Sequence, residues 1–331
     1  MSKRFQAVFI EESAGAAVAA MKEIGLEDLP NRDVLVEVAF SSLNYKDGLA
    51  LCGNRNKVAR KLPLIGGIDL AGTVVESRSP DWHPGDKVIV NGWGMSEVHW
   101  GGFTRYQRVD PGWIVPQPDA FTAEQAMAIG TAGYTAALCV EALERWGSVS
   151  ADGEVLVTGA AGGVGSVAIA LLAARGYNVT ASSGRSDTHA YLRRLGARNI
   201  IERESLAVKG APLQKERWFG AVDSVGSTTL VNVLSQTAYG AAVAACGLAG
   251  GADLPGTVLP HILRGVALLG VDSVMAPMPK RKVAWARLAR DLRPALLAEM
   301  TRVEPMSRLP QLGQEIVAGR VQGRVVIDVT R

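Results

Sequence analysis

Cysteine is scarce in this chain. Three residues, Cys52, Cys139 and Cys246, are scattered over 331 positions. An odd and widely spaced set excludes a disulfide framework and is typical of reduced, mostly buried thiols in a cytoplasmic protein. The four histidines also lack the spacing of metal ligands: they are His83, His99, His189 and His261. We therefore expect no metal site.

Strong charge and long apolar runs are also missing. The formal net charge is +3, which is too small for a protein that binds nucleic acid through a basic field. The conspicuous apolar run "VAIALLAA", residues 167–174, is far shorter than the roughly 20 residues that span a bilayer. The start, "MSKRFQAVFIEES", reaches acidic residues before any long apolar segment. The sequence predicts neither a nucleic-acid partner, nor a membrane span, nor a targeting segment.

Short β segments dominate the first third of the chain. They combine alternating or dense β-branched residues with Pro, Gly and Asp turns. The segments are "RFQAVFI", "DVLVEVAFSSL", "IDLAGTVVES", "GDKVIVNGWG" and "GGFTRYQRVD". Little here has helical periodicity, so we expect a β-rich, barrel-like unit.

The pattern changes after Asp119. Thr122 and Gln125 have the spacing of a capping box, and the Ala-rich sequence that follows is helical to about Arg145. Beyond it, apolar strands alternate with helices at the spacing of a parallel sheet with right-handed crossovers. The last strand, "GRVVIDVTR", is expected to return to the first unit. The predicted division is 1–122 for the β-rich catalytic domain, 123–270 for a nucleotide-binding domain and 271–331 for the return.

A Gly-rich turn, "TGAAGGVGS", lies between an apolar strand and an Ala/Leu helix. Glycines let the backbone approach a pyrophosphate, and the helix N-terminus offers unpaired N–H groups. Ala160 replaces the first glycine of the usual G-x-G-x-x-G, whereas Gly162 and Gly165 match. With a strand before it and a helix after it, the turn predicts dinucleotide binding.

The end of the next strand indicates which dinucleotide is bound. An NAD enzyme places Asp or Glu there for the ribose hydroxyls, but this chain has Ser182, Ser183 and Arg185. Hydroxyl groups and a guanidinium suit a 2′-phosphate, which a carboxylate would repel. Arg203 either closes the other side of this phosphate or is a solvated surface charge. The pattern favours NADPH over NADH.

These motifs resemble those of the medium-chain dehydrogenase/reductase superfamily, in its zinc-free, quinone-oxidoreductase-like branch. "GIDLAGTVV" stands where zinc enzymes carry Gly-His-Glu, and Ile68 and Asp69 offer no imidazole. Asn44 and Tyr45 stand where a cysteine ligand is expected. "LNYKDGLALCGN", "AACGLAGG", "LRGVALLGVDSV" and "QGRVV" are similar to the acrylyl-CoA reductase family, which reduces acrylyl-CoA to propanoyl-CoA with NADPH.

The resemblance implies an α/β fold: a β-rich GroES-like catalytic domain plus a doubly wound, parallel-sheet Rossmann domain. It also implies a homodimer that pairs the last Rossmann strand, near residues 267–271. The implied cofactor contacts, together with the 2′-phosphate set, are Tyr45, Ala161, Gly162, Gly163, Val164, Ser182, Ser183, Gly184, Arg185, Arg203, Leu248, Ile262, Ser273 and Arg324.

Reduction of an unsaturated thioester needs a hydride at the β carbon and a proton at the α carbon. Negative charge develops on the thioester oxygen, so a donor is required there. We expect Asn44, Tyr45 and Asp47 to form the floor of the pocket. Tyr45 is the candidate donor or cofactor-positioning group, Asn44 an orienting amide, and Asp47 a residue that fixes the turn. The alternative is a purely structural turn in which Asn44 and Asp47 cap backbone groups.

A CoA thioester carries phosphates, and two basic segments are candidates for binding them. The first contains Arg55, Lys57, Arg60 and Lys61, and the second contains Lys280, Arg281 and Lys282. The alternative for each is a solvated surface. Trp93 and Trp100 either wall the acyl pocket or pack against the protein, and His99 is expected to be structural.

Three functions remain open at this point. The first is NADPH-dependent reduction of acrylyl-CoA or a similar short enoyl thioester. The second is reduction of a quinone or enone by the same fold. The third is a non-catalytic NADPH-binding protein with a structural or regulatory role, because cofactor binding requires no turnover.

Overall fold

A computed structural model describes residues 3–147 and 153–331, which form two compact units. Unit 1 comprises Met1–Thr131, Ser273–Val283 and Leu297–Arg331, and unit 2 comprises Ala132–Asp272 and Ala284–Leu296. The chain therefore leaves unit 1 and returns to it, as expected for the final strand. The predicted domain boundaries at 122 and 270 stay a prediction.

Unit 1 is built from two β-sheets. The smaller has the order β2-β1-β4, with β1 (Arg4–Ser13), β2 (Ala16–Gly25) and β4 (Leu64–Ile65), all antiparallel. The larger has the order β15-β16-β3-β5-β6-β8, and β7 also pairs with β3. Its strands are β3 (Val34–Leu43), β5 (Asp69–Ser77), β6 (Lys87–Asn91), β7 (Tyr106–Val109), β8 (Ile114–Pro116), β15 (Thr301–Pro305) and β16 (Arg324–Asp328).

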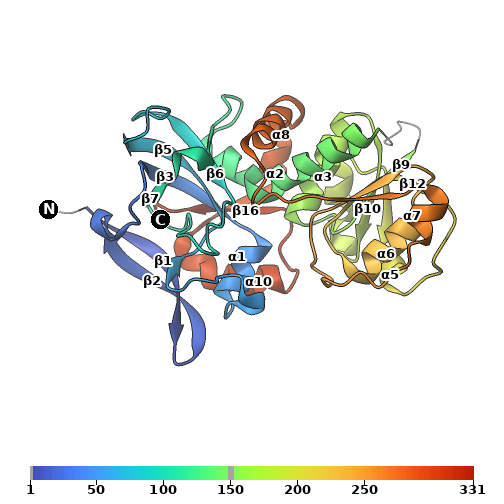
Figure 1. Ribbon diagram of the computed structural model, residues 1–331, viewed down its shortest axis with the longest axis horizontal. Helices are drawn as coiled ribbons and strands as arrows, with labels where there is room; N and C mark the ends of the chain where they lie inside the picture. Colours follow the sequence, from blue (N-terminus) through green and yellow to red (C-terminus); the bar gives the residue numbers. More distant parts are fainter. Residues whose placement is uncertain (1–2, 148–152) are drawn as a thin grey trace. The chain divides into compact units, whose positions relative to one another are not determined.

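The tail predicted to return is β16, which pairs antiparallel with β3 (Figure 1). Val34, Val36 and Val38 on β3 are fully buried in the core of this unit. Two helices lie side by side in unit 1, α1 (Tyr45–Leu51) and α10 (Leu309–Val317). A Cβ at Gly48 would lie 3.2 Å from the Gly313 carbonyl, so glycine permits this close packing. β16 and α1 both lie next to the end of β3, where the candidate residues begin.

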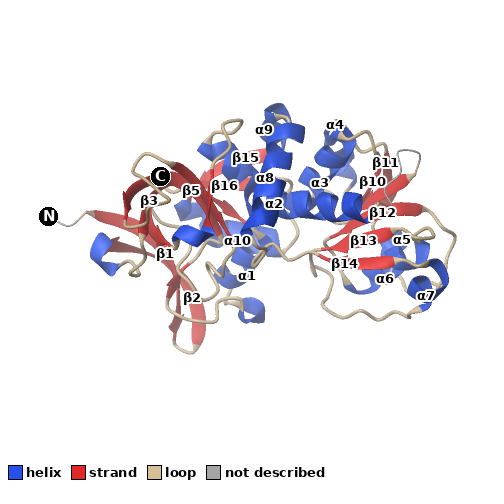
Figure 2. Ribbon diagram, turned by 45° about the horizontal axis from the view of Figure 1, so that its top comes forward, coloured by secondary structure: helices blue, strands red, loops and turns tan. Residues whose placement is uncertain are grey.

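Unit 2 contains a parallel sheet with the order β11-β10-β9-β12-β13-β14, a doubly wound Rossmann order. The strands are β9 (Glu154–Val157), β10 (Asn178–Ser183), β11 (Asn199–Glu202), β12 (Trp218–Asp223), β13 (Ala242–Ala245) and β14 (Ala267–Gly270). The helices are α3 (Gly163–Ala174), α4 (His189–Leu195), α5 (Glu204–Ala207), α6 (Ser227–Gln236) and α7 (Leu259–Arg264). Figure 2 shows α3 and α4 on one face of this sheet and α5 and α6 on the other. Together the two units confirm the predicted fold class.

The chain changes unit at four points, and three of them lie within helices: α2 (Ala123–Trp146), α8 (Met278–Asp291) and α9 (Pro294–Met300). The fourth point lies between Asp272 and Ser273, after β14. The predicted capping box of α2 is formed, because the Gln125 amide nitrogen donates to Thr122 Oγ1 and the Thr122 amide donates to Gln125 Oε1. α2 breaks at Gly130, whose φ is 52°. This helix is long and apolar enough to cross a membrane, but 89% of its apolar window is buried within the protein, as in a core helix.

Short 3-10 turns connect several of these elements. They are η1 (Leu26–Asp28), η2 (Arg55–Lys57), η3 (Pro111–Trp113), η4 (Ser186–Thr188) and η5 (Met306–Arg308).

Candidate active site

The three polar residues at the start of α1 differ sharply in exposure. Tyr45 is 38% exposed, whereas Asn44 is 6% and Asp47 is 1% exposed. Asp47 faces inward because its Oδ2 accepts from the Asn44 amide nitrogen at 3.0 Å and its Oδ1 from the Ile68 amide nitrogen at 3.0 Å. Of the three candidates, Tyr45 therefore has the side chain that a ligand can reach.

Asp47 lies in an environment that disfavours its charge. Burial, together with the nearby carboxylate of Asp69, raises the pKa of Asp47 to about 8, although hydrogen bonds from Asn44 and Ile68 oppose the rise. Asp47 is therefore mostly protonated at neutral pH. This suits the predicted role of fixing the turn, because the carboxyl group has no exposed route to a substrate.

The side chain of Asn44 is held by residues from two other strands. Its Nδ2 donates to Asp69 Oδ2 at 3.1 Å, and its Oδ1 accepts from Arg324 at 3.3 Å. Asp69 begins β5 and Arg324 begins β16, so both come from strands next to β3 in the sheet. Arg324 is 2% exposed, and its predicted contact with the cofactor stays a prediction. The contact of Asp69 with Asn44 was not predicted from the sequence, although an acidic residue within the apolar "PLIGGIDLAGTVV" is a signal for a buried polar role.

The Gly-rich turn of unit 2 joins β9 to α3. Gly159 has a φ of 57°, and the turn is fastened to β10 because the Ala160 amide donates to the Ser182 carbonyl at 3.3 Å. A Cβ at Gly162 would meet one neighbour, the Gly159 carbonyl at 3.2 Å, which leaves this side of the turn open to a ligand. A Cβ at Gly165 would lie 2.5 to 2.7 Å from backbone atoms of Gly159 and Ala160, so this glycine is required for helix packing.

The predicted 2′-phosphate residues lie together at the ends of β10 and β11. Ser183 and Glu202 are register partners in these strands, and the Arg203 amide donates to the Ser183 carbonyl at 3.2 Å. The guanidinium of Arg203 lies over Gly184, because a Cβ there would be 2.9 Å from its Nε. Arg203 is 62% exposed and pairs only weakly with Glu204, at 3.4 Å, so its charge is available to an anion.

The remaining cofactor candidates fall in both units. Tyr45, Ser273 and Arg324 belong to unit 1, and Leu248 and Ile262 belong to unit 2. Leu248 is 53% exposed and Ile262 is 68% exposed. Ala161 is 6% exposed, whereas Gly163 and Val164 are half-buried. Their predicted contacts with the cofactor stay predictions.

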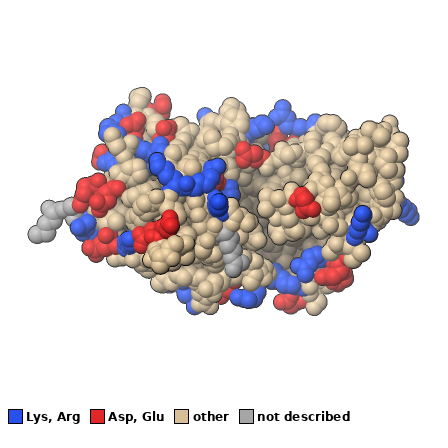
Figure 3. Space-filling model, turned by 60° about the horizontal axis from the view of Figure 1, so that its bottom comes forward, with Lys and Arg blue, Asp and Glu red and all other residues tan. Residues whose placement is uncertain are grey.

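The basic residues proposed for CoA differ in their availability. Lys57 and Lys61 are exposed, whereas Arg60 donates to Glu97 at 2.9 Å, and Glu97 also binds Lys46 at 2.6 Å. The side chain of Arg55 lies outside the described residues. Figure 3 shows that Lys and Arg side chains lie close to Asp and Glu side chains over the face it draws. Glu97, which the sequence analysis missed, partly neutralises this loop.

Arg281 is not part of an exposed basic segment, so its predicted availability to CoA phosphates is wrong. The side chain is 1% exposed and donates to backbone carbonyls at Asn91, Val274 and Ala276 at 2.6 to 2.7 Å. It also stacks over Trp93 at 4.1 Å. These contacts join Asn91 to the segment around Arg281 within unit 1 and keep the guanidinium buried. The sequence around Arg281 does not predict them, because Asn91 is 190 positions away.

The other aromatic and titratable candidates make packing contacts. Trp100 packs edge-on against Phe9, with ring centroids 5.1 Å apart. His99 is hydrogen-bonded to Arg32 at 3.0 Å, and burial together with this cation lowers the pKa of His99. The three cysteines form no disulfide; Cys139 is buried, whereas Cys52 and Cys246 are half-buried. Within the described residues, no group of three His, Cys, Asp or Glu side chains is arranged to hold a metal ion.

Comparison with known proteins places these features in a family. The alcohol dehydrogenase GroES-like domain matches residues 30–119, and the zinc-binding dehydrogenase family matches residues 163–289. The yhdH oxidoreductase of Salmonella enterica, solved in complex with NADP, is 48% identical, with a TM-score of 0.95 over 98% of this chain and 99% of that chain. The Bacillus subtilis protein yhfP, solved with NAD bound, is 44% identical, with a TM-score of 0.94 over 99% of this chain and 100% of that chain.

A curated relative identifies the family more narrowly. The acrylyl-CoA reductase AcuI of Ruegeria pomeroyi is 52% identical over 321 residues, which are 96% of this chain and 97% of that protein. Identity at this level over nearly the whole of both chains shows common family membership. The chain therefore belongs to the acrylyl-CoA reductase family of the medium-chain dehydrogenase/reductase superfamily.

Proposed function

We propose that this protein uses NADPH to reduce the C=C bond of a short α,β-unsaturated acyl-CoA, namely acrylyl-CoA to propanoyl-CoA. The observation that carries this proposal is the 52% identity to an acrylyl-CoA reductase over nearly the full length of both proteins. The phosphate-binding geometry of unit 2 supports the cofactor. The exposed Tyr45 beside a buried polar network supports a reaction that needs one well-placed donor.

The residues at the ends of β9, β10 and β11 fit NADPH. The open side of Gly162 and the N-terminus of α3 accommodate a pyrophosphate, since a longer side chain at Gly162 would fill that space. Arg185 and Arg203 offer donors and positive charge to a 2′-phosphate, and no carboxylate ends β10 to repel it. Ser183 is 6% exposed and its hydroxyl is hydrogen-bonded to Thr188 at 2.9 Å, so its contact with the phosphate stays a prediction. Because solved relatives hold either NADP or NAD, this set of residues is what favours NADPH here.

The bound cofactor supplies the hydride that goes to the β carbon of the substrate. The phenol of Tyr45 donates a hydrogen bond where negative charge develops on the thioester oxygen. Asn44 and Asp47 hold the turn from inside. The α carbon then takes a proton, and because Asp47 is 1% exposed we assign the delivery of that proton to Tyr45 or to solvent.

The reaction needs no zinc in this proposal. Asn44, Tyr45 and Ile68 stand where zinc enzymes of this superfamily place a thiolate and an imidazole, and none of them is a good zinc ligand. Activation by the thioester lowers the demand on the protein, and placement of the reacting groups supplies much of the rest. Among the described candidates for CoA phosphates, Lys57, Lys61, Lys280 and Lys282 are exposed, whereas Arg60 also pairs with Glu97.

The proposed assembly is a cytoplasmic homodimer. β14 is the outer strand of the Rossmann sheet, and its residues are half-buried or exposed. The N–H groups of Ala267 and Val271 bond to β13, so those of the alternate residues face the open edge. Pairing this edge with that of a second copy would satisfy those groups.

One assay tests the activity. NADPH oxidation is followed with acrylyl-CoA, crotonyl-CoA and a simple quinone in parallel. We expect rapid oxidation with acrylyl-CoA, slower oxidation with crotonyl-CoA, and almost none with the quinone. Oxidation with the quinone alone would indicate an enone or quinone reductase. Tight NADPH binding without turnover of any substrate would indicate a non-catalytic protein.

A further inference from the structure

Two oppositely charged side chains are buried beneath the turn that carries Tyr45. Asp69 is fully buried and Arg324 is 2% exposed. They begin β5 and β16, the two strands that flank β3, and β3 ends immediately before Asn44. Burial of a charge costs several kcal/mol unless hydrogen bonds compensate it, so this arrangement calls for a specific role.

The carboxylate of Asp69 accepts hydrogen bonds from three segments. The Ser42 amide and hydroxyl donate from the end of β3, at 2.8 to 2.9 Å. Thr131 donates its amide from α2 at 2.8 Å, and Asn44 donates Nδ2 at 3.1 Å. Thr131 directly follows the break of α2 at Gly130. Asp69 therefore joins the end of β3, the turn before α1 and the resumed α2.

Arg324 completes the arrangement from the other side. Its Nε donates to the Ala128 carbonyl at 2.9 Å, before the break in α2, and one terminal nitrogen donates to Ser42 Oγ at 2.7 Å. Ser42 thus links the guanidinium to the Asp69 carboxylate. Gly130 makes room for this link, because a Cβ there would lie 2.5 Å from both Ser42 Oγ and a terminal nitrogen of Arg324.

The side-chain amide of Asn44 is consequently held at both ends. Its NH₂ group points to the Asp69 carboxylate and its oxygen to the Arg324 guanidinium. A flipped amide would place its oxygen against the carboxylate and its NH₂ group against the guanidinium, so neither hydrogen bond could form. The backbone of Asn44 is fixed as well, because its carbonyl accepts from the Gly48 amide at 3.1 Å in the first turn of α1. The next residue is Tyr45, whose position follows from that of Asn44.

We propose that Asp69 is a positioning residue for the reduction, and that it acts through Asn44 to fix where Tyr45 presents its phenol. The inference rests on the proposed role of Tyr45 in the reaction. It assigns a function to a carboxylate that contacts neither substrate nor cofactor in the proposed scheme. It also explains why an ionisable residue occupies the fully buried first position of β5.

The test is a double-mutant cycle on the full chain. Asp69→Asn keeps the size and shape of the side chain but replaces one carboxylate oxygen with an NH₂ group. This group cannot accept the hydrogen bonds that Ser42, Asn44 and Thr131 donate to the carboxylate. Loss of Tyr45 placement is expected to lower kcat/KM for acrylyl-CoA by about 100-fold. In a Tyr45→Ala background the same change is expected to cost less than about 3-fold, because the group it positions is gone. If Asp69→Asn lowers kcat/KM by the same factor in the wild-type and Tyr45→Ala backgrounds, the proposal is overturned.

A second readout does not depend on turnover. Hydrogen exchange of the peptide covering residues 41–52 is expected to be faster in Asp69→Asn, because the anchor of Asn44 is lost. Tyr106→Phe is the control: it removes a partly buried hydrogen bond to Glu37, in the same unit, and is expected to leave both exchange and kcat/KM unchanged. Unchanged exchange in Asp69→Asn overturns the proposal. If the wild-type protein reduces no thioester, the proposed function fails, and the exchange result still decides whether Asp69 anchors the turn.

Discussion

At the scale of single residues, adjacent polar positions carry different tasks because they differ in exposure and partners. Tyr45 is exposed, whereas the side chains of Asp47 and Asn44 are buried and make hydrogen bonds within unit 1. The sequence predicted this set of residues and a role for each, but it left open a purely structural turn. The side-chain direction of Asn44 depends on Asp69 and Arg324, which lie 25 and 280 positions from it along the chain.

Arg203 is expected to distinguish the two nicotinamide cofactors. Arg203→Gln removes the charge that lies over Gly184, and we expect the Kd for NADPH to rise by about 10-fold, the equivalent of about 1.4 kcal/mol, while the Kd for NADH barely changes. Fluorescence titration measures both constants. Arg145→Gln is the control, since Arg145 is an exposed cation of unit 2 at the end of α2. An equal rise in the Kd values for NADPH and NADH in Arg203→Gln would contradict a contact of Arg203 with the 2′-phosphate.

Asp47 is expected to make stability depend on pH. Its pKa is raised from 3.8 to about 8 in the folded protein. Between these two pH values the folded state keeps a proton that the unfolded state has released. This contribution is fully present below pH 3.8 and is lost as pH rises through about 8. Between about pH 7 and pH 9 the loss is about 1 kcal/mol.

Urea unfolding at several pH values measures this effect. Asp47→Asn is the comparison, because its side chain does not ionise and the Asp47 component of the pH dependence should vanish. The variant is expected to be less stable than the wild type near neutral pH, since an NH₂ group cannot accept the backbone hydrogen bond that a carboxyl oxygen now accepts. A wild-type slope that persists unchanged in Asp47→Asn would show that another group titrates.

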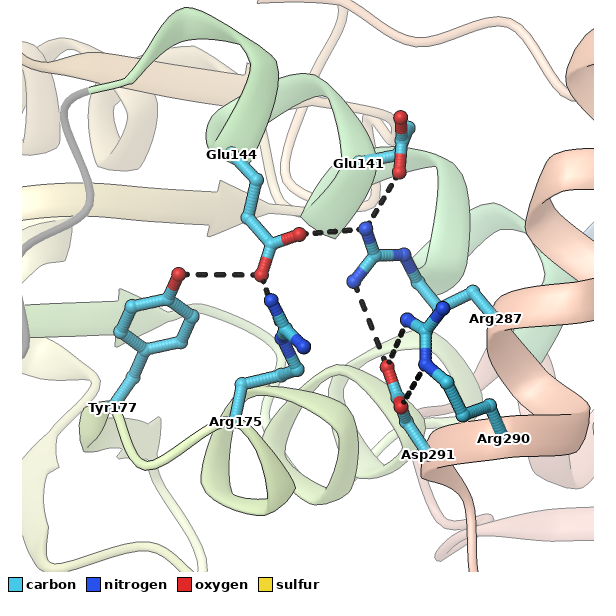
Figure 4. Close-up of polar contacts among 7 residues, drawn as sticks. All are labelled: Glu141, Glu144, Arg175, Tyr177, Arg287, Arg290 and Asp291. Atoms are coloured by element: carbon cyan, nitrogen blue, oxygen red, sulfur yellow. Dashed lines mark hydrogen bonds and ion pairs between the residues drawn. The ribbon is translucent and has the colours of Figure 1, made fainter.

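At the scale of elements, an ion network joins helices of unit 2. Arg287 on α8 contacts Glu141 and Glu144 on α2, each at 2.6 Å, and Asp291 at 3.7 Å (Figure 4). Glu144 also accepts from Arg175 and Tyr177. Burial alone would raise the pKa of Glu144, but the hydrogen bonds from the two arginines lower it. The sequence predicted α2 and its capping box from neighbouring residues, whereas this network depends on residues more than 140 positions apart.

Loss of Arg287 is expected to destabilise the protein. Arg287→Ala leaves Glu141 and Glu144 without their shared cation, at a cost of about 2 kcal/mol, less than for a fully buried pair because both carboxylates retain some solvent contact. Arg290→Ala is the matched control on the same helix. The Arg290 side chain is 60% exposed and pairs with Asp291, so its loss should cost less than about 1 kcal/mol. Thermal unfolding of both variants measures the difference, and equal effects would contradict a stabilising role specific to Arg287.

At the scale of the whole molecule, the chain forms one unit from three separated segments and another from two. The return of the tail was predictable, because "GRVVIDVTR" has the pattern of a strand and follows the last helix. The assignment of Ala284–Leu296 to unit 2 was not predictable from the sequence. This segment lies within helical sequence, and contacts such as those of Arg287 decide which unit it joins.

The open edge of β14 is expected to form the dimer interface. Gly270 is exposed and a Cβ there would meet nothing within 4 Å in this chain, so Gly270→Lys should leave the protomer folded. Across a two-fold axis, the introduced lysines would repel each other and charge the edge. Sedimentation velocity is expected to show a monomer. Val208→Lys is the control at a 74% exposed position after α5. A dimer that persists in Gly270→Lys would place the interface elsewhere.

The sequence by itself determined the features that neighbouring residues encode: the Gly-rich turn, the hydroxyl and guanidinium groups that favour NADPH, and the absence of a thiolate at Asn44 and Tyr45. These depend on short segments whose backbone conformation and chemistry are local. The tertiary structure decided which polar groups are exposed and which are anchors. Asp69, Arg324 and Arg281 are buried because segments far apart in the chain satisfy their hydrogen bonds, and no local pattern records such contacts.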